Sequence, residues 1–385
     1  MFPAFLLFGI LASATTVDVR LFSTAAITQT WISTYNADHY LIALNQNFEI
    51  IDTVADLVEK AGTNRLVVTL SNKRVQVKQG ESNYGEFAGL LVVAKTSKGH
   101  FLIKGKGRER IYSGSLILRP RTADMLVVNR VPLEDYVAGV VESEGGHHAQ
   151  FEYFKAQAVL ARTWVLKNMN KHLDEGYNVK DDVTSQAYYS KAYLQFSDNI
   201  LRAVKETRDT ILVDQAGNPI FGAFHSNSGG QTANSEDAWS GKISYLRSVE
   251  DSFSLKMEKA YWEKTISKTS FVSYFATKLE QSATDAEFVK AILSFKQPTR
   301  QAYFTYKGKS LKLRYVRQKF DLRSTFFSVY DQGDNVLLKG RGFGHGVGMS
   351  QEGAMRMAEL GYCYKDILKF YFKNVQFSNI NGKSF

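Results

Sequence analysis

Residues 131–144 read Val-Pro-Leu-Glu-Asp-Tyr-Val-Ala-Gly-Val-Val-Glu-Ser-Glu, and the rest of the chain can be placed around this stretch. Pro132 suits the first position of a helix, where a missing N–H costs nothing. Glu134 and Asp135 then place negative charge against the positive end of the helix dipole. A pair of glycines follows, so the sequence predicts a helix that ends there.

The predicted helix carries an acidic residue on its apolar face. At about 100° per residue, Glu144 continues the stripe of Leu133, Val137 and Val140. Glu142 is expected to point the opposite way. Apolar surroundings disfavour the charged form of a carboxyl group, which suits it to donate a proton near neutral pH. Glu144 is therefore a candidate catalytic acid, although a frayed helix end would also place a glutamate here.

A second amphipathic helix is predicted from Phe151 to about His172. Its buried stripe consists of Phe154, Ala158, Ala161, Val165 and Met169. Lys155 and Arg162 lie seven residues apart on an adjoining face. They are either solvated charges on a surface helix or residues that contact a substrate.

Two glycine-rich motifs follow, His225-Ser-Asn-Ser-Gly-Gly-Gln-Thr232 and Gly340-Arg-Gly-Phe-Gly-His-Gly-Val-Gly-Met-Ser-Gln351. In the first, a strand that runs into small polar residues and paired glycines favours a ligand cleft; a tight turn with a capping histidine is the alternative. In the second, five glycines in nine residues allow left-handed backbone. Ser350 is expected to cap a helix over 351–360. The motif lacks the Gly-Lys-Ser/Thr ending of a phosphate-binding loop.

Together with Lys155-Ala-Gln-Ala-Val-Leu-Ala-Arg-Thr163, these motifs resemble the SpoIID/LytB family in sequence and in order. The resemblance implies a cell-wall protein. Sporulation members of the family are lytic transglycosylases that cut peptidoglycan strands stripped of their peptides. The family's catalytic acid is the Glu of its Ser-Glu pair, which corresponds to Glu144. The helical stripe selects the same residue independently.

The resemblance also implies a set of residues that bind the substrate or orient Glu144. These are Lys155, Arg162, Gln186, Tyr188, His225, Ser226, Ser228, His345, Ser350 and Gln351. In some members a Cys or His in the segment corresponding to 183–189 contributes to a metal site, but Ser185 and Ala187 stand here instead. We therefore expect no metal or other cofactor. Trp239 either stacks on a pyranose ring or belongs to the core.

The pattern of strands and helices predicts an α+β fold: a mixed β-sheet core with packed helices and an active-site cleft lined by loops. Residues 15–118 form a β-rich N-terminal region, with a short helix at 52–61, and residues 119–385 form the catalytic core. A variable insertion at about 251–335 shows no evident chemistry. It is expected to contain helices at 271–280 and 285–294 and strands at 301–306, 311–316 and 326–330.

The net charge indicates which partners the protein can bind, and the cysteine content excludes a disulfide within the chain. The net charge of +10 and the pI of about 9.3 favour an anionic partner. A Lys/Arg-rich run, zinc-finger spacing and an aromatic RNA-binding pattern are all missing from the sequence, so nucleic acid is not expected. Peptide-free (denuded) glycan carries a lactyl carboxylate on every muramic acid, which would suit a basic cleft. Cys363 is the single cysteine, so no disulfide can form within the chain.

The N-terminus indicates export. Residues 2–11 are apolar and precede Ala12-Ser-Ala14, a small-x-small pattern typical of signal-peptidase cleavage. The run has no Lys or Arg before it, and a buried strand is the alternative. We expect a signal peptide at 1–14 and a mature protein in the periplasm or cell envelope.

The expected activity is cleavage between N-acetylmuramic acid and N-acetylglucosamine, with Glu144 as acid and then base and a 1,6-anhydro sugar as product. This reaction needs one carboxyl group, whereas glycoside hydrolysis ordinarily needs two. The protein is expected to act with a cell-wall amidase. One alternative is a non-catalytic glycan-binding enhancer of such an amidase. Another is a metallohydrolase with His147, His148, His225 and His345, although adjacent histidines cannot easily share one metal.

Overall fold

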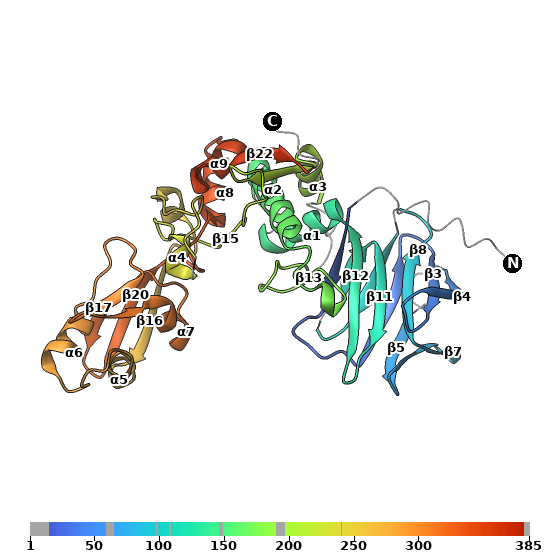
Figure 1. Cartoon of the computed structure of the whole chain (residues 1–385), viewed down its shortest axis with the longest axis horizontal. Coiled ribbons are helices and arrows are strands. Elements are labelled where there is room, and N and C mark those ends of the chain that lie inside the picture. The colour runs from blue at the N-terminus through green and yellow to red at the C-terminus, as the bar shows by residue number, and fades with distance from the viewer. Residues whose placement is uncertain are drawn as a thin grey trace. The chain divides into compact units, whose positions relative to one another are not determined.

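The computed structural model describes residues 15–58, 65–97, 99–107, 109–145, 149–189, 197–239 and 241–380. These residues form two compact units (Figure 1). Unit 1 contains the described residues up to 145 together with 157–210, and unit 2 contains 149–156 and 211–380. The predicted signal peptide and the pair His147 and His148 lie outside the described residues.

Unit 1 is built on two antiparallel sheets, to which one short strand adds in parallel. Among the described residues, seven strands form the first sheet. Their order is β13 (Val179–Lys180), β1 (Thr16–Arg20), β12 (Met125–Pro132), β11 (Ser115–Pro120), β8 (Gly89–Ala94), β3 (His39–Leu44) and β4 (Ile50–Leu57). The second sheet, of six strands in the described part, has the order β10 (Arg110–Ser113), β9 (His100–Lys104), β2 (Gln29–Tyr35), β5 (Leu66–Ser71), β6 (Arg74–Gln79) and β7 (Ser82–Phe87).

Alternating apolar residues bury one face of these strands against the other sheet. Val17 and Val19 of β1, and Val75 and Val77 of β6, are completely buried, whereas the residues between them are not. Strand β6 contacts β11 and β8 of the first sheet. The predicted β-rich N-terminal region and the α+β class are confirmed.

Two details of unit 1 differ from the expectation. The short helix predicted at 52–61 is wrong over residues 52–57, because β4 pairs there with β3; residues 59–61 lie outside the described residues. β-Branched residues favour a pleated strand. The division expected after residue 118 falls within β11, which pairs with β8 on one side and β12 on the other. The N-terminal region and the start of the predicted core therefore share one sheet.

The helices of unit 1 follow β12. They are α1 (Leu133–Gly145), the larger part of α2 (Phe151–Lys167) and α3 (Ser197–Glu206). Pro132, predicted as the first residue of the helix, ends β12, and α1 begins one residue later at Leu133. Helix α1 packs against α3 and β12, and its residues 136–141 are buried on all sides. For this reason Glu142 is buried, at 9% exposure, and the prediction that it faces outward is wrong.

Unit 2 joins the two glycine-rich motifs. Strand β15 (Phe224–His225) pairs in parallel with β21 (Met349–Ser350), and α8 (Gln351–Glu359) follows directly. The Ser350 Oγ accepts a hydrogen bond from Gly353 N at 3.2 Å, so the predicted helix cap is confirmed. The other elements outside the insertion are β14 (Thr210–Val213), α4 (Ser235–Ala238), α9 (Tyr364–Tyr371) and β22 (Gln376–Asn379).

The stretch predicted as an insertion folds around a core of its own (Figure 1, orange). Its sheet has the order β16 (Tyr261–Ser267), β20 (Asn335–Arg341) and β19 (Phe327–Gln332), and the remaining elements are α5 (Lys268–Leu279), α6 (Ala286–Leu293), β17 (Tyr303–Tyr306), β18 (Lys309–Lys312) and α7 (Leu313–Lys319). Both predicted helices are confirmed. The strand predicted at 311–316 is wrong beyond Lys312, because Leu313 and Val316 lie on one buried face of α7.

Among the described residues, no helix combines the length and the apolar character needed to cross a membrane.

Candidate functional site

Glu144 lies in the last turn of α1 and is half-buried. Its Oε1 accepts a hydrogen bond of 2.7 Å from the backbone N–H of Ala187. The neighbouring Ser143 Oγ accepts one from Tyr189 N at 3.1 Å and donates to Gly139 O at 2.7 Å. The segment 187–189 is thus tied to the end of α1, and it fixes the orientation of the candidate catalytic carboxyl group.

Tyr189 lies beside this carboxyl group and was missed by the sequence interpretation. The ring is half-buried and faces the Arg110 guanidinium at 5.1 Å. Burial raises the pKa of Tyr189, and the charges of Asp181 and Glu144 raise it further. The phenol therefore stays protonated near neutral pH.

Gln186 and Tyr188, both predicted to bind substrate, belong to the core of unit 1. They are 1% and 0% exposed. The Tyr136 hydroxyl donates to Gln186 Oε1 at 3.1 Å, and the Tyr188 hydroxyl donates to Asn129 Oδ1 at 2.9 Å. The Tyr188 ring packs against those of Tyr112 and Tyr136. These side chains point inward, so the structure gives them a supporting role beneath 187–189 in place of a substrate contact.

Arg162 is also buried, contrary to both interpretations of its position. Its Nε and Nη2 donate to the two carboxylate oxygens of Glu134 at 2.9 and 2.6 Å, and its Nη1 donates to Thr210 O at 3.0 Å. The residue is 0% exposed, which leaves no surface for a substrate. Lys155 is half-buried and forms an ion pair of 3.0 Å with Glu152 on the same helix.

The two glycine-rich motifs interlock within unit 2. Asn227 and Phe343 form a bridge with hydrogen bonds of 3.0 and 2.8 Å, next to the pairing of β15 with β21. Gly229 and Gly342 have φ values of +68° and +77°, and a Cβ on either would lie within 2.6 Å of backbone of the other motif. The prediction of left-handed backbone in the second motif is confirmed.

Interlocking buries several residues that were predicted to line a groove. Ser228, Ser350 and Gln351 are buried, and Ser228 Oγ donates to the Asp251 carboxylate at 2.7 Å. Their burial does not agree with a place on an open groove surface, and the Ser228 and Ser350 hydroxyls instead bond buried backbone and carboxyl groups. Ser226 stays half-buried, and its carbonyl accepts from Glu352 N at 3.0 Å.

His225 and His345 come together, with ring centroids 5.6 Å apart. The His225 Nδ1 donates to Val347 O at 3.1 Å, whereas the His345 Nδ1 accepts from Val347 N at 3.1 Å. The two neutral rings are thus opposite tautomers. Burial, with a smaller effect of His345 and Arg300, lowers the pKa of His225 well below its usual value. Burial and the charges of Arg317 and Arg300 together lower the pKa of His345 to about 4. Both imidazoles are therefore neutral at pH 7.

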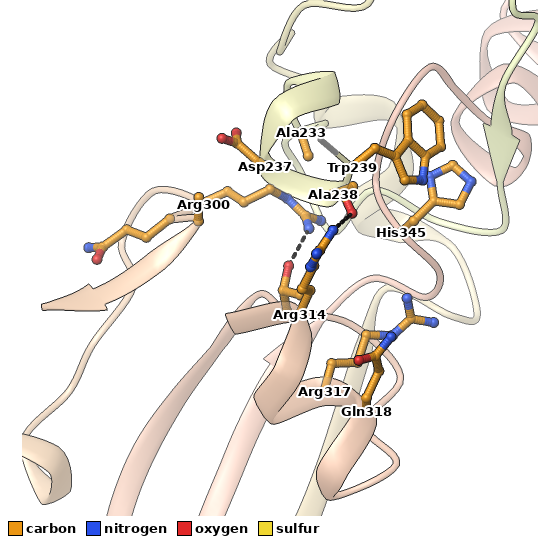
Figure 2. A pocket seen from close by; sticks show the side chains of 12 residues that line it. Ala233, Asp237, Ala238, Trp239, Arg300, Arg314, Arg317, Gln318 and His345 are labelled. Carbon is orange, nitrogen blue, oxygen red and sulfur yellow. Dashed lines mark hydrogen bonds between the residues drawn. The ribbon is translucent and has the colours of Figure 1, made fainter. Parts of the chain in front are cut away.

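Trp239 packs against His345 at 5.2 Å and against Phe221 at 5.3 Å, and it is half-buried. Trp239 and His345 border a cavity of about 300 Å³ in unit 2. Figure 2 shows their rings side by side, with Arg300, Arg314 and Arg317 around the rest of the cavity. The sequence interpretation missed these arginines, since they belong to the stretch in which no chemistry was recognised.

The structure thus gathers the predicted residues into two groups, each described within its own unit. Glu144 lies with 187–189 in unit 1, and the histidines lie with Trp239 in unit 2. In the described part of the chain, no three His, Cys, Asp or Glu side chains cluster as a metal site would require.

Comparison with known proteins relates the chain to sporulation proteins. The family model described as SpoIID, stage II sporulation protein, matches residues 121–213, which include Glu144. The chain is 36% identical to stage II sporulation protein D of Bacillus subtilis (strain 168) over 275 residues, which is 68% of this chain and 78% of the relative. It is 35% identical to the Bacillus amyloliquefaciens protein of the same name over 299 residues, 74% of this chain and 85% of the relative. An amidase enhancer of Bacillus subtilis (strain 168) is 27% identical over 284 residues, 61% of this chain and 39% of the relative.

Proposed function

Because the chain belongs to the SpoIID family, we propose that it is a lytic transglycosylase that cleaves denuded peptidoglycan strands between N-acetylmuramic acid and N-acetylglucosamine. The observation that carries the proposal is the fixed carboxyl group of Glu144, held by the Ala187 N–H at 2.7 Å at the end of a buried helix. A carboxyl group in one defined orientation can serve two successive proton transfers on a bound sugar.

The proposed reaction uses Glu144 as acid and then as base. The protonated carboxyl group gives its proton to the glycosidic oxygen, and the bond between this oxygen and C1 of the muramic acid breaks. The resulting carboxylate takes the proton of the C6 hydroxyl, and the C6 oxygen forms a bond to C1. The products are a 1,6-anhydro-muramyl end and a new hydroxyl on N-acetylglucosamine, and Glu144 is protonated again. No water is consumed.

We also propose that the protein acts outside the cytoplasm, in the periplasm or cell envelope, where its substrate lies. The proposal rests on the apolar run 2–11 and on Ala12-Ser-Ala14. N-terminal sequencing of protein recovered from the envelope fraction should begin at residue 15. An intact N-terminus on protein in the cytoplasmic fraction would contradict it.

Replacement of the carboxyl group tests the proposed catalytic role. Glu144→Gln keeps the shape of the side chain but cannot donate and recover a proton, so release of anhydro-muramyl sugars from denuded glycan should fall by at least about 100-fold. Mass spectrometry of the soluble products measures this release. Glu206→Gln makes the same chemical change at an exposed position of unit 1 and should leave the rate unchanged.

A glycan-binding role is the rival outcome of the same experiment. The similarity to a protein named amidase enhancer makes a cell-wall amidase a reasonable partner. If wild-type protein releases no sugar, and Glu144→Gln stimulates an amidase on intact peptidoglycan as strongly as wild type does, the catalytic proposal is wrong. In that case the binding role replaces it.

A further inference from the structure

The cavity beside Trp239 and His345 carries an excess of positive charge. Its charged lining residues are Arg300, Arg314 and Arg317 against the single carboxylate of Asp237, and its volume of about 300 Å³ lies at the small end of ligand pockets. Arg314 and Arg317 are three residues apart on α7, so both reach the cavity from one face of the helix.

The three arginines differ in how many of their side-chain N–H groups already donate hydrogen bonds to the protein. Arg300 donates to Gln231 O, to Thr325 Oγ1 and to Ser228 O at 2.9, 3.2 and 2.7 Å, which makes it a structural link. Arg314 donates to Ala238 O at 3.2 Å and to the Tyr315 hydroxyl at 2.9 Å. Arg317 donates through Nε to Leu322 O at 3.1 Å. Within the described residues, neither Arg314 nor Arg317 forms an ion pair, and the Arg317 Nη groups have no hydrogen-bond acceptor.

Two carboxylates offset this charge only in part: the charge of Asp237 raises the pKa of Arg300, and that of Asp321 raises the pKa of Arg317. The Asp237 Oδ2 accepts hydrogen bonds from the backbone N and the side-chain Nδ2 of Asn234 at 3.3 and 3.2 Å, in the capping box of α4. The positive charge acts on the other lining residues of the cavity, since Arg317 adds to the effect of burial in lowering the pKa of His345. A guanidinium with unused donors in such a place favours an anion, and its two parallel N–H groups match a carboxylate.

An aromatic wall faces these donors. Trp239 is held between Phe221 and His345, and Figure 2 shows it at the opposite side of the cavity from α7. Aromatic rings that line a pocket present a flat apolar surface, on which the C–H face of a sugar ring can pack. The cavity therefore joins a surface for a ring with donors for a negative charge.

We infer that this cavity is a binding site for a carboxylate carried on a sugar ring, in which Arg317 and Arg314 hold the carboxylate and Trp239 contacts the ring. The choice of N-acetylmuramic acid as the sugar rests on the proposed function, because denuded glycan carries a lactyl carboxylate on that residue. The site itself rests on the cavity and its charges.

Calorimetric titration of the full chain with four probes separates the two parts of the ligand. N-Acetylmuramic acid carries both the sugar ring and the carboxylate. N-Acetylglucosamine has the ring without the carboxylate, and lactate has the carboxylate without the ring. Inorganic phosphate is an anion that has neither a ring nor a carboxylate. We expect N-acetylmuramic acid to bind at least about tenfold more tightly than any other probe. Equal affinity for phosphate or lactate, or for N-acetylglucosamine, would overturn the inference.

Variants on α7 test the residues. Arg317→Gln and Arg314→Gln should each weaken the binding of N-acetylmuramic acid by about tenfold or more while the affinity for N-acetylglucosamine stays unchanged. Lys319→Gln removes the same charge from an exposed position of the helix and should change neither affinity. The thermal unfolding midpoint of each variant must match wild type for the comparison to count, and two arginines provide two independent chances of a folded variant. Unchanged affinity for N-acetylmuramic acid in a folded Arg317→Gln variant would refute the site.

Two separate assays of the wild-type protein distinguish a failure of this site from a failure of the proposed function. Titration with N-acetylmuramic acid reports on the cavity, whose lining residues all belong to unit 2, and release of anhydro-muramyl product reports on Glu144 in unit 1. A chain that binds this sugar but releases no anhydro product would lose the catalytic proposal and keep the binding site.

Discussion

The Arg162 guanidinium is completely buried in unit 1, and both oxygens of the Glu134 carboxylate accept its hydrogen bonds. Arg162→Met removes the donors of the partly exposed Glu134 carboxylate and of the buried Thr210 carbonyl, so the free energy of unfolding should fall by about 1–3 kcal/mol. Urea denaturation measures this change. Arg202→Met, at an exposed position of α3, should cost less than about 0.5 kcal/mol. A similar small loss for both variants would show that the bonds of Arg162 to Glu134 and Thr210 contribute little to stability.

The neutral histidines of unit 2 make stability depend on pH. The pKa of His345 falls from 6.5 in the unfolded chain to about 4 in the fold, so between these values the unfolded state binds more protons. The contribution of His345 is therefore complete above pH 6.5 and decreases as the pH falls toward 4.

His345→Gln should remove part of this acid sensitivity. At pH 5 the loss of stability relative to pH 7.5 should be about 1–2 kcal/mol smaller in the variant than in wild type. Urea midpoints measured across this pH range provide the comparison. Parallel curves for the two proteins would show that His345 is not held neutral by the fold.

At the scale of elements, the indole of Trp262 on β16 packs directly against the backbone of β20 at Gly340. A Cβ on Gly340 would lie 2.0 Å from Trp262 Cε2, and the two residues are paired across the sheet. Gly340→Ala should therefore destabilise unit 2 by about 1–3 kcal/mol through overpacking. Gly241 has open space around its Cβ position and no left-handed φ, so Gly241→Ala serves as the control. Thermal unfolding of both variants decides; equal midpoints would mean that the indole moves aside at no cost.

The helices and strands also show which sequence patterns are sufficient to predict secondary structure. The helix over 286–293 and the cap at Ser350 were predicted correctly, because periodicity and caps are local properties. The region of strand β4 was predicted as a helix and the start of helix α7 as a strand, since a short apolar run fits either period. Pairing with β3 and burial in the insertion core decide these cases, and both are tertiary effects.

At the scale of the whole molecule, membership of the SpoIID family was predictable from motifs that keep their order along the chain, and it is confirmed. The place of Glu144 at the end of a helix was predictable as well. The burial of Arg162, Gln186 and Tyr188 was not, because their partners come from distant segments. The arginine-lined cavity was missed for the same reason, since its walls combine loops and helices that are separated in sequence by more than a hundred residues.

The source of oxygen in the cleaved glycan tests the central claim most directly. Wild-type protein is given denuded peptidoglycan in water enriched in heavy oxygen, and the released muramyl ends are weighed by mass spectrometry. If Glu144 directs the C6 oxygen to C1, each new end is lighter than a reducing end by one water and carries no heavy oxygen. Reducing ends that carry heavy oxygen would show hydrolysis instead, and the proposed transglycosylase would be wrong.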